Sequence, residues 1–376
     1  IGTKYVGEMD RIFESYGELV PLMQDFYRSQ HAQGTDIGDL AYRQTIRAKA
    51  FDAVRGLLPA ASLSNVGIYG TGQAYEALLL RMRAHPLPEA RSYSDLMLAE
   101  LRKVIPSFLR RVDVEERGVA WSRYLETNQI TMKEIAESVT GGITPDPAPE
   151  VDLIDWDPDG ERKMLAAMLY PYSQIPETQL VDLVDGMTAT QRIDLVRRYV
   201  GERGNRRHRP GRALERLDYR FDVLGDYGGF RDLQRHRLLT IEWQSLTPDH
   251  GYETPEALVN AGLGERYAGV MERSRSLYQM LLPEFPERAA YAVAMAFRVR
   301  YVMQFNAREA LHMIELRSQP QGHPNYRRIA QEMYHQIATK AGHSAVAEMF
   351  TYIDLSAGED GRLQAEKALE VKRSAR

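Results

Sequence analysis

Apolar residues recur at helical spacing along much of the chain. The stretches with this pattern are 5–27, 39–58, 72–84, 89–112, 115–138, 161–169, 187–202, 265–283, 286–317 and 325–342. One segment alternates instead: Leu217–Leu224 reads LDYRFDVL, with an apolar or aromatic residue at every second position, which is typical of a strand. These patterns predict a helix-rich α+β fold.

Proline and aspartate are concentrated between residues 144 and 160, which include the run TPDPAPEVDLIDWDPD. Proline ends helices and favours extended backbone. A chain of 376 residues is also long for one core, and its length suggests two domains or a duplicated unit. We therefore expect 144–160 to link a first part, 1–143, to a second part, 161–376.

Two short segments recur in the same order in both parts, which predicts an internal duplication. Tyr5-Val-Gly-Glu-Met-Asp-Arg11 resembles Tyr267-Ala-Gly-Val-Met-Glu-Arg273, and Ala74-Tyr-Glu-Ala-Leu78 resembles Ala307-Arg-Glu-Ala-Leu311. Chance similarity between amphipathic helices is the alternative. If the copies are real, residues 164–262 have no counterpart in the first part, so the first copy is truncated at its start.

Composition narrows the class of protein. Hydrophobic residues make up 44% and charged residues 27%, and no apolar run approaches the roughly 20 residues needed to span a bilayer. The net charge of −4 gives no overall basic field for a nucleic acid polymer. Cysteine is absent, which excludes thiolate metal sites and cysteine nucleophiles and is compatible with a reducing compartment. We expect a cytoplasmic protein without a metal, because the histidines have no ligand-like spacing.

Two Arg-His-Arg triplets are the candidate chemistry, at 207–209 and 235–237. The first lies in a loop-like basic cluster, which could hold a phosphate or simply be solvated. The second is followed, after seven residues, by Ser245. Guanidinium groups beside an imidazole can pair bidentately with phosphate while the ring stacks or donates to a ligand.

The second triplet and its spacing to Ser245 resemble the signature of the flavin-dependent thymidylate synthases. A second feature lies in register with it: Asn306-Ala-Arg308 leads through His312 to Leu316-Arg317, as in the C-terminal helix of that family. Taken singly, His312 would be a satisfied helix histidine and Arg317 a surface ion pair. Because both residues lie in register with the second triplet, a functional role for His312 and Arg317 is favoured. The resemblance covers roughly 164–342 and, more faintly, 5–112.

The resemblance implies a fold of two tandem synthase-like copies and assigns roles to individual residues. The implied FAD contacts are Arg235, His236, Arg237, Asn306, Arg308 and His312. At the substrate dUMP, the expected residues are Gln234, Arg235, Ser245, Arg317 and Arg55. Arg317 would be catalytic, polarising the pyrimidine by stabilising negative charge on it. On a regular helix Asn306 and Arg317 share one face and Arg308 and His312 another, so one site requires that 306–308 precede the helix, or that two ligands occupy different faces.

The sequence also departs from the family. Leu246, Thr247 and Pro248 follow Ser245, where the family has x-Arg-Tyr, so one phosphate contact is missing. Arg55-Gly-Leu-Leu-Pro59 matches the family's Arg-x-x-Leu-Pro pattern and could replace an arginine that the second copy lacks. Family members are homotetramers with shared sites, so the resemblance implies a homodimer that mimics the tetramer. It also predicts that a Ser-x-Arg-Tyr motif precedes Ile1.

The activity that the resemblance implies is methylation of dUMP to dTMP, with methylenetetrahydrofolate and NADPH as co-substrates and FAD as cofactor. The absence of cysteine agrees with this flavin route, which needs no thiolate. Two alternatives stay open: a non-catalytic paralogue that binds a flavin or nucleotide, and a related flavin enzyme acting on another pyrimidine nucleotide.

Overall fold

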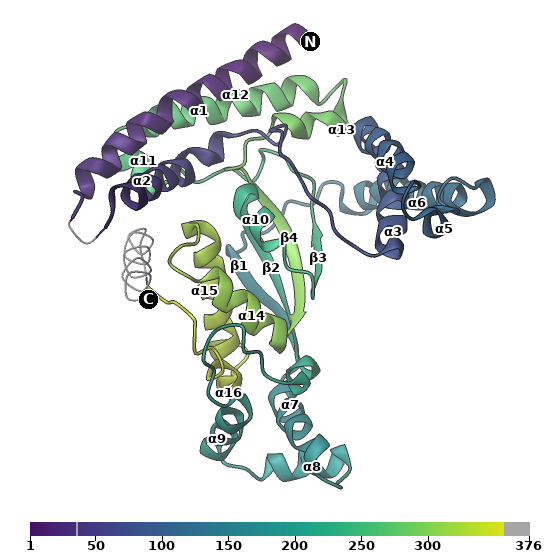
Figure 1. Cartoon of the computed structure of the whole chain (residues 1–376), viewed down its shortest axis with the longest axis vertical. Helices are drawn as coiled ribbons and strands as arrows, with labels where there is room; N and C mark the ends of the chain where they lie inside the picture. Colours follow the sequence, from purple (N-terminus) through teal and green to yellow (C-terminus); the bar gives the residue numbers. More distant parts are fainter. Residues whose placement is uncertain (35–36, 357–376) are drawn as a thin grey trace. The chain divides into compact units, whose positions relative to one another are not determined.

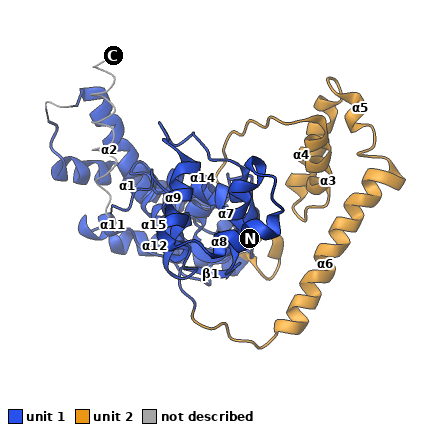
Figure 2. Cartoon of the chain, turned by 90° about the horizontal axis from the view of Figure 1, so that it is seen from below, with its two compact units in different colours: residues 1–61, 148–280, 290–376 blue, residues 62–147, 281–289 orange. Residues whose placement is uncertain are grey.

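The computed structural model describes residues 1–34 and 37–356 (Figure 1). Two compact units are present (Figure 2). The larger unit comprises residues 1–61, 148–280 and 290–376, and the smaller unit comprises 62–147 and 281–289. These boundaries do not coincide with the expected ones at 143 and 161, because the first 61 residues belong to the same unit as the C-terminal part. The duplication itself stays a prediction.

The larger unit contains most of the elements. Its helices are α1 (Gly2–Gln30), α2 (Asp39–Val54), α7 (Gly160–Leu169), α8 (Glu177–Asp185), α9 (Ala189–Val200), α10 (Tyr227–Leu233), α11 (Glu256–Asn260), α12 (Gly264–Leu281), α14 (Ala307–Arg317), α15 (Pro324–Thr339) and α16 (Ser344–Ala347). Its strands are β1 (Val151–Trp156), β2 (Asp218–Asp226), β3 (Thr240–Trp243) and β4 (Arg298–Asn306). The expected helix-rich α+β class is therefore observed.

An antiparallel sheet of order β1-β2-β4-β3 forms the centre of the larger unit. Alternate residues of β2, such as Tyr219, Phe221 and Val223, are buried in a core that they share with α7, α9, α10, α14 and α15. The intervening Arg220 and Asp222 point to the other face, where they line a depression of about 480 Å³. This alternation is what one covered and one open face require. The strand expected at 217–224 is thus confirmed as β2.

The helix expected over 286–317 is wrong, because its centre is the strand β4. Val299, Tyr301, Met303 and Phe305 are buried at every second position, and β4 pairs with both β2 and β3. Their two-residue period, rich in aromatic and β-branched side chains, was mistaken for helical spacing. Only short helical turns, among them α13 (Pro286–Ala289), precede the strand, and α14 follows it.

Part of the expected linker is also an edge strand. Within 144–160, β1 pairs with β2, and Val151 and Leu153 enter the core. The outer edge of β1 is covered by one side chain: Gln336 of α15 accepts a hydrogen bond from Leu153 N at 2.6 Å and donates to Val151 O at 2.8 Å. Such pairing protects an exposed strand edge.

The N-terminal segment, residues 1–61, is joined to the rest of the larger unit by helix packing and backbone pairing. Ion pairs of Glu8 with Arg273 and of Glu18 with Arg266 place α1 antiparallel to α12 (Figure 1). After α2, the backbone of residues 56–61 pairs with 291–296, with Ala296 N bonded to Gly56 O at 2.8 Å. A Cβ on Gly56 would lie 2.4 Å from the Tyr267 hydroxyl, so only glycine fits there. This pairing fixes the neighbouring Arg55.

The smaller unit is helical. It contains α3 (Gly72–Arg83), α4 (Pro88–Leu101), α5 (Pro106–Leu109), α6 (Ala120–Thr140) and α13. Leu79, Leu98, Leu109 and Val112 form its small core. The helix expected over 89–112 is interrupted, and its second part, α5, begins at Pro106. Within the described part of the chain, no helix combines the length and the apolar character needed to cross a membrane.

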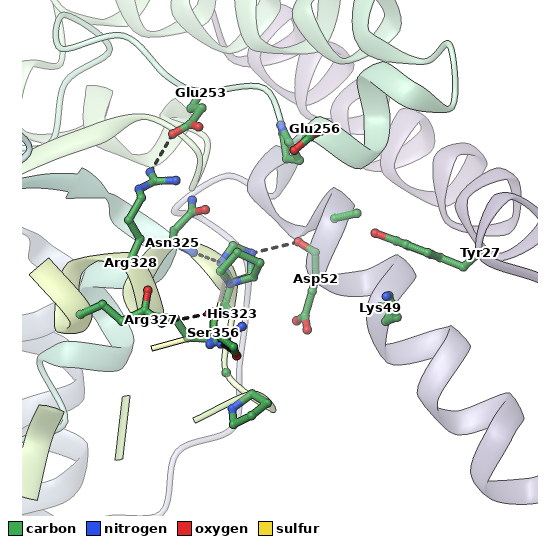
Figure 3. A pocket seen from close by; sticks show the side chains of 16 residues that line it. Tyr27, Lys49, Asp52, Glu253, Glu256, His323, Asn325, Arg327, Arg328 and Ser356 are labelled. Atoms are coloured by element: carbon green, nitrogen blue, oxygen red, sulfur yellow. Dashed lines mark hydrogen bonds and ion pairs between the residues drawn. The ribbon is translucent and has the colours of Figure 1, made fainter. Parts of the chain in front are cut away.

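His323 ties α2 to α15. It caps α15, accepting from Asn325 N at 3.3 Å, and its Nε2 lies 3.2 Å from the carbonyl oxygen of Asp52, to which it donates. It also lines a cavity of about 380 Å³ between α2 and α15, in which Arg328 pairs with Glu253 (Figure 3). Burial lowers the pKa of His323 to about 4.

We expect His323 to make folding stability depend on pH. An unfolded histidine has a pKa of about 6.5, so between about pH 6.5 and 4 the unfolded chain binds a proton that the folded chain excludes. The free energy of unfolding should therefore fall as the pH drops through this range. The variant His323→Asn, which keeps an N-cap acceptor, should lose less stability between about pH 7 and pH 5 in urea titrations. An equal loss in both proteins would contradict the assignment.

Candidate active site

The second triplet lies at the C-terminal end of α10. Asp226 begins this helix by accepting from Gly229 N at 2.8 Å, and Gln234 ends it. His236 turns inward and its side chain is 3% exposed. Arg235 and Arg237 on either side are exposed. The short helix thus presents one buried imidazole between two solvent-facing guanidinium groups.

Asp232, one turn before the triplet, gathers three arginines from separate parts of the chain. Its carboxylate lies 3.6 Å from Arg55, 3.5 Å from Arg235 and 3.7 Å from Arg317. Asp232 and Arg317 are largely buried, with side chains 17% and 13% exposed. The guanidinium of Arg317 also lies over the ring of Tyr326, 5.5 Å from its centroid. The structure therefore brings the distant Arg55 together with Arg235 and Arg317.

A chain of hydrogen bonds orients Arg317 through His236. Arg317 Nε donates to His236 Nε2 at 3.1 Å, and His236 Nδ1 lies 2.8 Å from Glu309 Oε1. Because Arg317 Nε can only donate, His236 Nε2 must accept, which places the ring proton on Nδ1. His236 is then neutral and donates to Glu309. The buried carboxylate of Glu309 therefore selects the tautomer that holds Arg317.

His312 and the first triplet's loop complete this region. The His312 ring packs edge-on against His236, with ring centroids 5.4 Å apart. Burial lowers the pKa of His312 to about 4, and the positive charges of Arg209 and Arg206 act in the same direction. His312 is consequently neutral near pH 7. The basic loop before residue 210, whose role the sequence left open, thus contributes positive charge here.

Asn306 and Arg308 are placed by the start of α14. Asn306 precedes the helix and caps it, accepting from Glu309 N at 3.0 Å. Only Asn306 therefore meets the condition that residues 306–308 precede the helix, because α14 begins at Ala307 and includes Arg308. Arg308 donates to Pro210 O at 3.0 Å and to Glu215 at 3.1 Å. Its guanidinium therefore contacts the loop after the first triplet instead of the Asp232 cluster.

The remaining expected residues are exposed. Gln234 and Arg237 are exposed, and neither side chain has a hydrogen bond or ion pair with another residue in the described ranges. Ser245 is exposed in the loop after β3. Trp243 pairs with Tyr301, so Ser245 lies toward the opposite end of β4 from Asn306. Among the described residues, no hydrogen bond joins Ser245 to Asp232 or to the arginines around it.

Three side chains here have the composition of a metal site. The ligand atoms of His236, Glu309 and His312 all lie within 4.8 Å of one another. A cation on His236 Nδ1 would displace its proton and require Nε2 to carry one, which conflicts with the Arg317 donor. Nearby guanidinium groups add repulsion. The arrangement favours an anion over a metal ion.

Positive charge exceeds negative charge in this region. Asp232 faces three guanidinium groups, while Glu315 is held in a bidentate pair by Arg203 at 2.6 Å. Among the described residues, Arg55 Nη2 and Arg206 Nη1 are buried without a hydrogen-bond partner. Buried guanidinium donors without partners are costly. An anionic ligand such as a phosphate would supply acceptors and charge together.

Sequence reasoning missed Asp232, Glu309 and Tyr326. Two local signals were available. Asp232 precedes Arg235 by three residues on a helix, which is the spacing of an ion pair. Glu309 follows the capping Asn306 at the position of a capping box, although here its side chain binds His236 instead of the backbone. Tyr326 carried no local signal.

A comparison with protein-family models identifies the family of this chain. Residues 152–342, about half of the chain, match the family model described as thymidylate synthase complementing protein. The chain belongs to this family. The match includes β1 except its first residue, the second triplet, β4, α14 and α15. Asp232, Arg235 and Arg317 thus lie within it, and Arg55 lies outside.

Relatives of this thymidylate synthase complementing family member match nearly its whole length. A UPF0159 protein of Chlamydia pneumoniae is 37% identical over 97% of this chain and 69% of its own. One from Chlamydia muridarum is 34% identical over 96% of this chain and 68% of its own. One from Thermoplasma acidophilum is 28% identical over 98% of this chain and 76% of its own.

Two solved structures resemble about half of the chain. The flavin-dependent thymidylate synthase ThyX of Helicobacter pylori, complexed with FAD and dUMP, is 17% identical with a TM-score of 0.39, covering 55% of this chain and 100% of that one. The UMP/dUMP methylase PolB of Streptomyces cacaoi, bound with 5-Br dUMP, is 18% identical with a TM-score of 0.40, covering 52% and 93%. At these TM-scores the likenesses add nothing to the assignment, which rests on the family match.

Replacing Glu309 should change the tautomer of His236. In Glu309→Leu the acceptor for Nδ1–H is lost, so we expect the ring proton to move to Nε2 and Arg317 to lose its partner. Glu309→Gln keeps an acceptor and should keep the wild-type tautomer. Long-range nitrogen–proton NMR of the histidine rings distinguishes the two forms. An Nε2–H tautomer in the wild-type protein would refute the assignment.

Proposed function

We propose that the protein is a flavin-dependent thymidylate synthase, methylating dUMP to dTMP with FAD, methylenetetrahydrofolate and NADPH. The observation that carries this proposal is the cluster of Arg55, Arg235 and Arg317 around Asp232, inside a chain of the thymidylate synthase complementing family. This cluster has more positive than negative charge, and the guanidinium of Arg317 within it is largely buried and held in one orientation.

The residues fit an anionic cofactor in part. Arg235 and Arg237 are solvent-facing on either side of His236, and Arg206 has a buried donor without a partner within residues 1–34 and 37–356. These groups suit the pyrophosphate of FAD. Arg308 could contact FAD only if it broke its hydrogen bonds to Pro210 and Glu215. The side-chain oxygen of Asn306 already caps α14, so only the other polar groups of this residue could contact the cofactor. When bound, the flavin supplies the redox chemistry.

Arg317 is the candidate catalytic residue. Its Nε is held by His236, and its guanidinium is steadied by Asp232 and the face of Tyr326. Such a preorganised cation in a largely dry site stabilises negative charge that develops on a pyrimidine ring. Arg55 would contact the nucleotide phosphate, because its buried Nη2 has no hydrogen-bond partner among the residues that the structure describes. The absence of cysteine agrees with a reaction that uses no thiolate nucleophile.

One observation favours a second candidate function, a flavin- or nucleotide-binding paralogue or an enzyme for another pyrimidine nucleotide. Leu246, Thr247 and Pro248 follow Ser245, so this loop offers no arginine to the site. The resemblance implies a dimer, in which a second copy of the chain would supply the groups that complete the site.

The visible spectrum of the purified protein, with and without added FAD, tests the proposal. We expect a bound flavin band that is lost in the double variant Arg235→Ala/Arg237→Ala, because both exposed guanidinium groups would hold the cofactor. Arg198→Ala, at an exposed arginine of α9, is the matched control and should retain the band. Addition of dUMP should perturb the band of the wild-type protein.

The outcomes separate the candidate functions. Conversion of dUMP to dTMP with methylenetetrahydrofolate and NADPH supports the synthase. A flavin band without conversion of dUMP, or with conversion of a different pyrimidine nucleotide, supports the second candidate. A protein that never retains FAD contradicts the synthase and every flavin enzyme, and leaves only a paralogue that binds a nucleotide without flavin.

A further inference from the structure

Helix α6 of the smaller unit carries an apolar stripe that is exposed along most of its length, with only Leu125 half-buried. Trp121, Leu125, Asn128, Met132, Ile135 and Val139 follow one another at alternating intervals of four and three residues. This is the heptad spacing of a coiled-coil seam. Trp121, Met132, Ile135 and Val139 are 58%, 58%, 46% and 71% exposed.

Helix α6 has few contacts with the rest of the smaller unit among the described residues, one of which is an ion pair of Lys133 with Glu287 of α13 at 3.2 Å. Ser122 is its one buried residue in the described chain, and it donates to Leu80 O at 3.1 Å to attach the first turn to α3. Residues 126–140 are all exposed, and α6 runs apart from α3, α4 and α5 (Figure 2). Six of its 21 residues are the β-branched Thr127, Ile130, Thr131, Ile135, Val139 and Thr140, which are weak helix formers. Its stability should therefore come from packing of the apolar stripe.

The charges of α6 are arranged to permit self-association. The positions that flank the stripe are uncharged: Ser122, Tyr124, Gln129, Thr131, Ala136 and Ser138. The charged residues Arg123, Glu126, Lys133, Glu134 and Glu137 lie away from the seam. Two identical helices could thus meet along it without placing like charges side by side.

Asn128 favours a parallel over an antiparallel pairing of two α6 helices. In a parallel, in-register pair, Asn128 meets its own copy, and two amides can donate to and accept from one another. In an antiparallel pair centred on residue 130, Asn128 would face Met132 and its amide would lack a partner. A single buried asparagine is a known means of fixing the register of such a pair.

We propose that α6 is an association surface, which binds α6 of a second copy of this chain in a parallel coiled coil. The inference is independent of the proposed enzyme activity. It also concerns a surface remote in sequence from the arginine cluster.

Engineered disulfide cross-linking tests the proposal directly, because the wild-type chain has no cysteine. We expect Asn128→Cys to form a covalent dimer on mild oxidation, since facing seam positions lie within disulfide reach in a parallel pair. Glu137→Cys, on the outer face of the same helix, is the control and should stay monomeric on a non-reducing gel. No excess cross-linking of Asn128→Cys over this control would overturn the proposal.

Light scattering of the full chain gives a second measurement. Ile135→Glu should halve the molar mass of the wild-type assembly, because a charge enters the seam. Ile130→Glu, at an outer position that is also about half exposed, should leave the mass unchanged. If Ile135→Glu has the same mass as wild type while circular dichroism reports an intact fold, the stripe packs elsewhere and the proposal is wrong.

Discussion

One carboxylate facing three guanidinium groups is the constraint on which the candidate site depends. Two opposite unit charges about 4 Å apart near a protein surface attract by about 4 kcal/mol before desolvation is counted, and solvent screening weakens this attraction at the exposed Arg235. Asp232 cannot neutralise all three arginines, and Arg55, Arg235 and Arg317 also repel one another. The cluster is therefore held together in a state that an added anion would stabilise further.

The fold forms this cluster by bringing together segments that are far apart in sequence. The backbone of residues 56–61 pairs with the segment that leads into β4, which fixes Arg55 beside α10. β4 in turn ends at Asn306, whose cap starts α14 and so sets the direction of Glu309 and Arg317. Strand pairing and helix capping thus decide where the charged side chains meet.

The sequence predicted those parts of the fold that depend on local patterns. The long amphipathic helices and β2 have a clear period, and the triplet and the Asn306 segment were found through their spacing. β4 was missed because a fully paired central strand has apolar residues that also satisfy part of a helical pattern. Asp232, Tyr326 and the exposed position of Ser245 depend on tertiary contacts between segments, which no local pattern contains.

The central claim is that Arg55 and Arg317 act on one nucleotide, and a double-mutant cycle for dUMP binding tests it most directly. The affinities of the wild-type protein, Arg55→Ala, Arg317→Ala and the double variant would be measured by calorimetry. Because the two arginines share Asp232, we predict a coupling energy of about 0.5–3 kcal/mol. Purely additive losses, or an Arg55→Ala variant that binds dUMP as wild type does, would contradict the claim.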